Sequence, residues 1–166
     1  MKNIKVLVPS GVLGLGFDLE ALKSGVKKKP DIISIDGGST DSGPASLGSG
    51  TSKYSRAAIK SEWKILMKAR EGLGIPLVIG SCGTCGTNSM VDWMETITIE
   101  LAEELGQSLK IAKLYCEQDN EFIKKNFLSN KLHPLDPAPF LDSKIIMSMS
   151  HICLLYTSPS PRDEVL

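Results

Sequence analysis

The chain has 166 residues, of which 42% are hydrophobic and 23% charged, so it is long enough to form one domain with a buried core. Its 19 basic residues equal its 19 acidic residues, which leaves no net field to attract nucleic acid or an anionic membrane surface. No apolar run reaches membrane-spanning length, no signal peptide is recognisable, and four cysteines in a chain this long do not make a secreted disulfide framework, which indicates a cytoplasmic protein.

Short runs rich in Val, Ile and Leu alternate along the chain with stretches in which apolar residues recur at helical spacing. The runs predict strands over residues 4–8, 32–36, 77–79 and 109–115, with a further strand over 144–148. The periodic stretches predict helices whose apolar faces fall within residues 19–26, 59–67, 90–105 and 122–127. Asp18 is expected to cap the first helix, and Gly106 to end the third.

Strands that alternate with helices favour a parallel sheet with right-handed crossovers. We therefore predict an α/β fold, a three-layer Rossmann-like open sheet that is mostly parallel and truncated at its C-terminal end. The four loops that follow the strands should lie at one edge of this sheet: residues 10–16, 36–56, 81–87 and 117–119. Ligands of open α/β sheets bind at that edge, so the functional site is expected there.

The loop after the third strand carries two cysteines at an expected helix N-terminus, where the helix dipole and free N–H groups stabilise a thiolate. Cys82 is a candidate nucleophile, and Cys82 with Cys85 is a candidate redox pair. The alternative is that both are small residues that suit a tight loop. No further Cys or His has the spacing of a metal site, so no metal is predicted.

Two glycine loops, residues 9–16 and 80–86, place backbone N–H groups near helix starts, which suits a phosphate or a carboxylate. The first loop is neither a dinucleotide fingerprint nor a P-loop, so the cofactor stays unknown. Lys53 and Arg56 add cations, and Arg56 at a helix start is expected to meet a ligand or an acid such as Asp36 or Asp41. The predicted ligand-binding residues are Ser10, Gly11, Gly38, Ser39, Thr40, Lys53, Tyr54, Arg56, Ser81, Gly83 and Thr84.

Acidic residues also follow the strands, at Asp36, Asp41, Glu117 and Asp119. Two of them that converge would serve as general acid and base. A single Asp in such a loop more commonly caps the loop itself. The predicted catalytic residues are Asp36, Asp41, Cys82 and Glu117.

Residues 153–163 resemble, codon by codon, the conceptual translation of a transposase sequencing adapter. We therefore divide the chain into an N-terminal α/β domain, residues 1–152, and a non-native tail, residues 153–166. The tail was never selected to pack, so we expect it to make no core contacts.

Several blocks together resemble the acyclic terpene utilisation (AtuA) family: residues 8–11, 36–44, 50–56, 80–87 and 117–119. The resemblance covers residues 4–152, and members of that family are considerably longer, so it implies an N-terminal fragment. The family is linked to acyclic terpene breakdown, which runs through acyl-CoA intermediates. The resemblance thus implies a catabolic protein.

From the resemblance and the residues together we expect an enzyme that acts on a small carboxylate or an acyl-CoA-type substrate. Its partner would be a small anionic ligand, with neither nucleic acid nor a membrane involved, and self-association into a homo-oligomer is left open. Two alternatives remain. One is a non-catalytic ligand-binding or complex-scaffolding protein, and the other is a thiol redox protein that uses Cys82 and Cys85.

Overall fold

The computed structural model describes residues 3–9, 11–38, 44–133, 140, 142 and 144. The chain divides into two compact units, residues 1–115 and 116–166, and each is described by itself. Several predictions fall on residues outside the described ranges: the site residues Ser10, Ser39, Thr40 and Asp41, most of the strand predicted over 144–148, and the tail from residue 153 onward.

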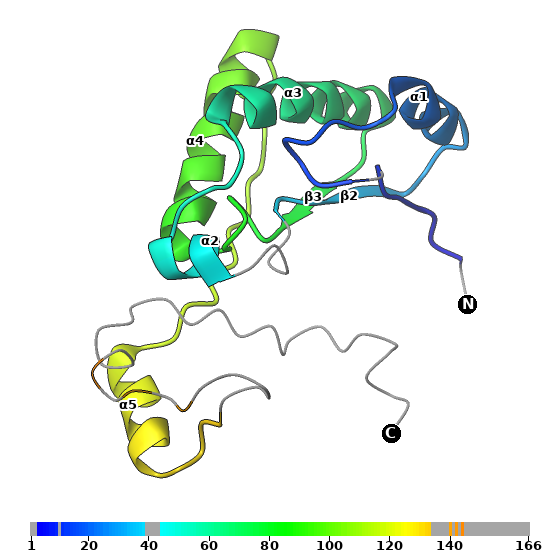
Figure 1. Ribbon diagram of the computed structural model, residues 1–166. Helices are drawn as coiled ribbons and strands as arrows, with labels where there is room; N and C mark the ends of the chain where they lie inside the picture. The colour runs from blue at the N-terminus through cyan, green and yellow to red at the C-terminus, as the bar shows by residue number, and fades with distance from the viewer. Residues whose placement is uncertain are drawn as a thin grey trace. The chain divides into compact units, whose positions relative to one another are not determined.

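The first unit is built on a three-stranded parallel sheet with the strand order β1-β2-β3 (Figure 1). Its strands are β1 (Val6–Leu7), β2 (Ile32–Asp36) and β3 (Leu77–Gly80). The second and third strands match their predicted ranges to within one residue. The first is shorter than predicted and is not a buried strand, because Ile4, Val6 and Val8 are exposed at the edge of the sheet.

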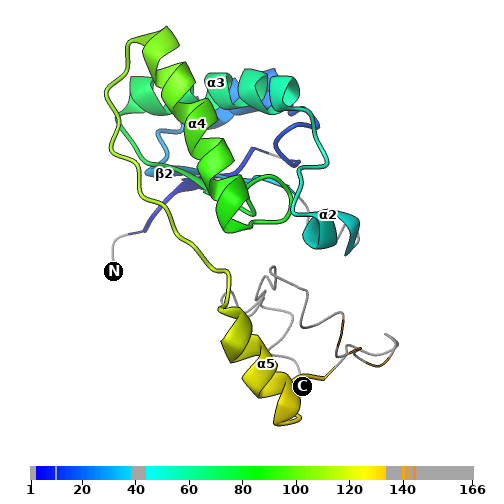
Figure 2. The ribbon, with the colours of Figure 1, turned by 90° about the vertical axis from the view of Figure 1, so that its left-hand side faces the viewer.

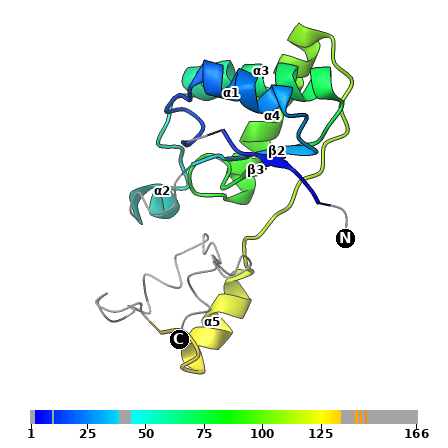
Figure 3. The same cartoon turned by 90° about the vertical axis from the view of Figure 1, so that its right-hand side faces the viewer.

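Helices α1 (Leu19–Lys27) and α3 (Arg56–Leu73) connect the strands and lie on the same side of the sheet (Figures 1 and 3). A sequential strand order with right-handed crossovers places every connecting helix on one face. Helix α4 (Asn88–Leu105) follows β3 and packs against α3 (Figure 2). The parallel α/β class is therefore confirmed. In the described part of this unit, no helix covers the second face, where Val6 and Val78 are exposed.

The helix ends follow local sequence signals. The Asp18 carboxylate accepts hydrogen bonds from two N–H groups in the first turn of α1, as predicted. Gly74 and Gly106 end α3 and α4 in the left-handed conformation that glycine adopts at low cost. Between the sheet and these helices lies a core that includes Trp63 and Met67, which fall within the apolar face predicted over residues 59–67.

Two segments differ from their predictions. A short helix, α2 (Pro44–Ser49), lies within the range predicted as a loop. The strand predicted over residues 109–115 is wrong: the segment is extended (Figure 2) but pairs with no strand among the described residues. Its C-terminal half is tied to α4 instead, where Lys113 Nζ donates to Asp92 Oδ1 at 2.9 Å and to Glu95 Oε2 at 2.7 Å.

The second unit contains helix α5 (Asn120–Leu128), in the range where the last helix was predicted. Asp119 caps it by accepting the Glu121 N–H at 2.7 Å, and Ile123 is its buried residue. Throughout the described ranges, no helix combines the length and the apolar character that crossing a membrane requires.

Candidate functional site

Three loops meet where β1, β2 and β3 end. The Leu13 N–H donates to the Asp36 carbonyl oxygen at 2.9 Å, and the Gly37 N–H donates to the Gly80 carbonyl oxygen at 2.7 Å. Asp36 is paired in register with Gly80, so Asp36 and Cys82 lie at the same edge of the sheet. The predicted convergence is therefore confirmed for these three loops. The fourth loop, residues 117–119, belongs to the second unit and is described only there.

Thr84 joins the loops that follow β2 and β3. Its N–H donates to the carbonyl oxygens of Gly37 at 3.3 Å and Ser81 at 3.0 Å, and its Oγ1 accepts the backbone N–H of Lys53 at 3.1 Å. The residue is only 1% exposed. A Cβ atom on Gly38 would lie 2.1 Å from Thr84 Cα, so the two loops touch backbone to backbone and only glycine fits at that position.

The loop after β3 is strained. Ser81 has φ 49° and Thr84 has φ 72°, a left-handed conformation that costs a residue with a side chain about 1–2 kcal/mol. Such strain persists only where the surrounding structure imposes it, and it concentrates at binding and catalytic sites. The strained loop therefore marks this part of the edge as the candidate site.

Both cysteines of that loop are buried thiols. Cys85 Sγ lies 3.5 Å from Thr87 Oγ1, and Cys82 lines a cavity beside β3. A Cβ atom on Gly83 would lie 2.5 Å from the sulfur of Met90, which explains why a glycine stands between the two cysteines. Burial of both thiols fits small residues in a tight loop better than an exposed redox pair. Among the described residues, no cluster of His, Cys and acidic side chains could hold a metal ion.

The glycine loop after β1 already binds an anion that belongs to this chain. The N–H groups of Gly14 and Gly16 donate to the two carboxylate oxygens of Glu62, at 2.7 and 2.8 Å. Glu62 lies on α3, three residues after Ile59 and four before Leu66, at a position where the apolar stripe would place a hydrophobic residue. The prediction that these N–H groups cradle an external anion therefore needs correction. Glu62, an acidic residue within the apolar face of α3, was the sequence signal that could have indicated this internal anion.

The second glycine loop also uses several of its donors within the fold. Besides Thr84, the N–H groups of Cys85 and Gly86 donate to the carbonyl oxygens of Gly83 and Cys82, each at 2.9 Å. Backbone donors of the two loops therefore contribute less to anion binding than the sequence suggested, and the cationic side chains gain importance.

Arg56 has a different acidic partner from those predicted. Its guanidinium bonds to Glu100 of α4, and Lys60 and Lys64 continue a ladder of ion pairs from α3 to Glu100 and Glu104. Hydrogen bonds from Lys60 and then Lys64 lower the pKa of Glu104 to about 2. A side chain that starts on α3 reaches α4 because the two helices pack together. The ion pair with Glu100 thus neutralises the charge of Arg56 at the start of α3.

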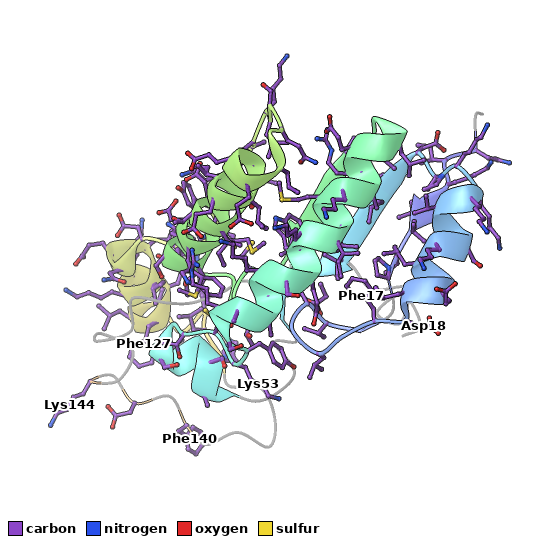
Figure 4. All side chains as sticks on the ribbon, turned by 90° about the horizontal axis from the view of Figure 1, so that it is seen from above. Phe17, Asp18, Lys53, Phe127, Phe140 and Lys144 are labelled. Atoms are coloured by element: carbon purple, nitrogen blue, oxygen red, sulfur yellow. The ribbon has the colours of Figure 1, made fainter. Side chains whose placement is uncertain are left out.

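Lys53 is the cation that remains at the edge. Its ammonium group forms no ion pair within the described part of the chain and lies 5.8 Å from the centre of the Tyr54 ring. Figure 4 shows Lys53 beside α2 and the start of α3. Tyr54 is half-buried, and a Cβ atom on Gly14 would lie 2.6 Å from its Cβ, so the phenol side chain packs on the first loop.

The candidate acids that the structure describes belong to different units. Asp36 Oδ1 accepts the Gly38 N–H at 3.0 Å, so this exposed carboxylate caps its own loop. Glu117 lies in the second unit. Gly11, with φ 95°, closes the first loop against the Gly16 carbonyl oxygen.

The structure therefore brings together one group of predicted site residues around Thr84: Asp36, Gly38, Lys53, Ser81, Cys82 and Gly83. It directs Arg56 to α4 and uses Tyr54 for packing. A comparison of the chain with protein-family models, with curated proteins and with solved structures finds no match in any of the three.

Proposed function

We propose that the carboxyl edge of β2 and β3 is the active site of an AtuA-like catabolic enzyme that acts on a small carboxylate or an acyl-CoA-type substrate. One observation carries this proposal: loops from three distant parts of the sequence are fastened together at Thr84, with strain at Ser81 and Thr84. Strain of this kind is expected where a loop is held in a conformation that a ligand needs. The sequence blocks that resemble the AtuA family include residues 36–44, 50–56 and 80–87, which contain these loops.

In this proposal Lys53 binds the anionic group of the substrate, because its ammonium group is exposed and unpaired among the described residues. Asp36 is the candidate proton carrier, and Cys82 is the candidate nucleophile in the strained loop. Arg56 is left out of the anion site because Glu100 engages it.

The three-layer Rossmann-like architecture belongs to the same proposal. The face of the sheet opposite α1 and α3 exposes Val6 and Val78, and Ile4 and Val8 are exposed beside them. Exposed apolar side chains grouped on a sheet mark a surface that another layer covers. We propose that a further layer of the fold covers this face.

Calorimetric titration with free CoA, short acyl-CoA thioesters and short carboxylates tests the anion site. Lys53→Ala should weaken binding about tenfold, the scale of one charge-assisted hydrogen bond. Lys68→Ala, which removes an exposed lysine from the middle of α3, is the matched control and should leave binding unchanged. Equal binding by both variants would remove Lys53 from the site.

A non-catalytic ligand-binding protein is the second candidate. It is favoured by the exposed Asp36 carboxylate, whose bond to the Gly38 N–H is the ordinary role of an Asp in a loop. A turnover assay on the same thioester panel separates the two candidates. Turnover that Asp36→Asn abolishes supports the enzyme, whereas ligand binding without turnover in either protein supports the second candidate.

A further inference from the structure

Strand β3 has an open edge. It pairs with β2 on one side, and no described strand pairs with the other side. Beside it lies a cavity of about 490 Å³ that is lined by residues 76–79 and by residues 109–114, among others. An unpaired strand edge offers a row of backbone donors and acceptors to any extended segment that reaches it. The segment across the cavity, residues 109–115, is called the strap below.

The strap has the side-chain alternation of a strand. Leu109 packs against the core, Lys113 bonds to two acids of α4, and Tyr115 bonds to one of them, Asp92. Three odd-numbered residues thus contact the core or α4, whereas Lys110, Ala112 and Leu114 are exposed, Leu114 at 87%, and Ile111 is exposed at 44%. Contacts at positions 109, 113 and 115 fit the period of two that a strand requires, so the strap can join the sheet with these residues on the helix side.

The connection to the strap has the length and position of a βαβ crossover. β3 leads into α4, α4 packs beside α3, and the strap returns along the open edge of β3. Right-handed crossovers of this kind place the next strand parallel to the last one. The sequential order β1-β2-β3 would then continue with the strap in the fourth position.

We propose that residues 109–115 close onto β3 as a fourth parallel strand, and that the structure describes the open state of this strap. Closure fills the cavity, which Cys82 also lines next to the strained loop, and pairs the open edge. The strap thus closes a cavity that borders the candidate site.

The chemistry of the cavity favours the strap over a foreign ligand. Its walls are mainly apolar, with Trp63, Met67 and Met94 among them. Two cations that line it are already engaged, because Arg70 bonds to Glu71 and Lys113 bonds to the acids of α4. What remains is apolar wall, the exposed Lys110 of the strap itself and the open strand edge, and the strap can pair with that edge and cover the apolar wall.

Paired cysteines test the closure in the full chain. In a background of Cys116→Ser and Cys153→Ser, Val78→Cys is combined in turn with Lys110→Cys, Ala112→Cys or Leu114→Cys, which share its face in the closed strand. The control combines Val78→Cys with Ile111→Cys, on the opposite face. One of the first three pairs should form an intramolecular disulfide at least about tenfold faster than the control, because bridging requires close, aligned Cβ atoms.

Hydrogen exchange on the unsubstituted chain gives an independent measurement in case a cysteine variant fails to fold. Amides of the strap and of the open edge of β3 should exchange together, at least about tenfold more slowly than free-peptide rates. Equal crosslinking of the even and odd pairs, or free-peptide exchange in the strap, would overturn the proposal. Disulfides found only between chains would show that the open edge of β3 binds a second copy of the chain, which would also overturn the proposal. Slow exchange that appears only after an apolar compound is added would show that the cavity binds a ligand instead of the strap.

Discussion

The two glycine-containing loops at the carboxyl edge, residues 11–16 and 81–87, look alike in sequence but are held in opposite ways. In the first, positive φ angles fall on glycines only, and the carboxylate of Glu62 occupies the N–H groups of Gly14 and Gly16. In the second, positive φ angles also fall on Ser81 and Thr84. The backbone of the first loop is unstrained and its N–H groups bind a carboxylate of the same chain, whereas the backbone of the second loop is strained. Between these two loops, strain rather than glycine content is the difference, and it is the reason for placing the candidate site at the second loop.

The largest expected effect concerns the contact that fixes the strained loop. Gly38→Ala would place a Cβ atom 2.1 Å from Thr84 Cα and 2.4 Å from Thr84 N, where neither backbone can give way. We expect a loss of roughly 3 kcal/mol or more in the free energy of unfolding, measured by denaturant titration. Gly72→Ala is the control, because nothing lies within 4 Å of its added Cβ. That helical substitution should stabilise the protein by about 0.5–1 kcal/mol. Tolerance of Gly38→Ala would show that the loops are not in rigid contact.

The relaxed loop is tested by removing its internal anion. Glu62→Ala leaves the Gly14 and Gly16 N–H groups without their carboxylate and should cost about 2–3 kcal/mol. Glu103→Ala removes an exposed acid from α4 and should be nearly neutral. Added phosphate or acetate should restore part of the melting temperature of Glu62→Ala alone. If neither anion helps, the loop donors do not form an anion site even when vacant.

A smaller effect of opposite sign is expected at Ser81. Ser81→Gly relieves a left-handed φ of 49° and should stabilise the fold by about 1 kcal/mol. Ser61→Gly, on the exposed side of α3, should destabilise it by about 0.5 kcal/mol, because glycine lowers helix propensity. If Ser81→Gly also weakens ligand binding, the strain serves the site. A destabilised Ser81→Gly variant would mean that the loop conformation is not strained.

The smallest effect belongs to the ion pairs between α3 and α4, which are exposed and screened by solvent. The pKa of Glu104 is about 2 in the fold, below its ordinary value of 4.5. Its contribution is therefore fully present above about pH 4.5 and is lost as the pH falls toward 2. Melting temperatures measured across that range should fall less steeply in Glu104→Gln than in the unsubstituted chain. Parallel curves would show that the ladder makes no contribution.

Local sequence signals predicted the secondary structure well where a residue interacts with backbone groups close to it in the sequence. Asp18 caps α1, Gly106 ends α4, and β2 has the predicted bounds, because each depends on neighbours in the chain. The parallel order also followed from the alternation of strands and helices. The segment 109–115 is not a strand among the described residues, because strand-forming residues become a strand only when they pair, and here Lys113 and Tyr115 bond to α4 instead.

The candidate site, too, has features that depend on local sequence and features that depend on packing between distant elements. The sequence by itself determined that the loops after β1, β2 and β3 share one edge, since parallel strands end on the same side. Only the tertiary structure decided what fills each loop, because Glu62 and Glu100 reach their partners from residues more than forty positions away. Thr84 shows the same dependence, since its hydrogen bonds to Gly37 and Lys53 join loops that are distant in the chain. Spacing along a chain governs hydrogen bonds within one turn or helix, whereas packing between elements governs which carboxylate meets which donor.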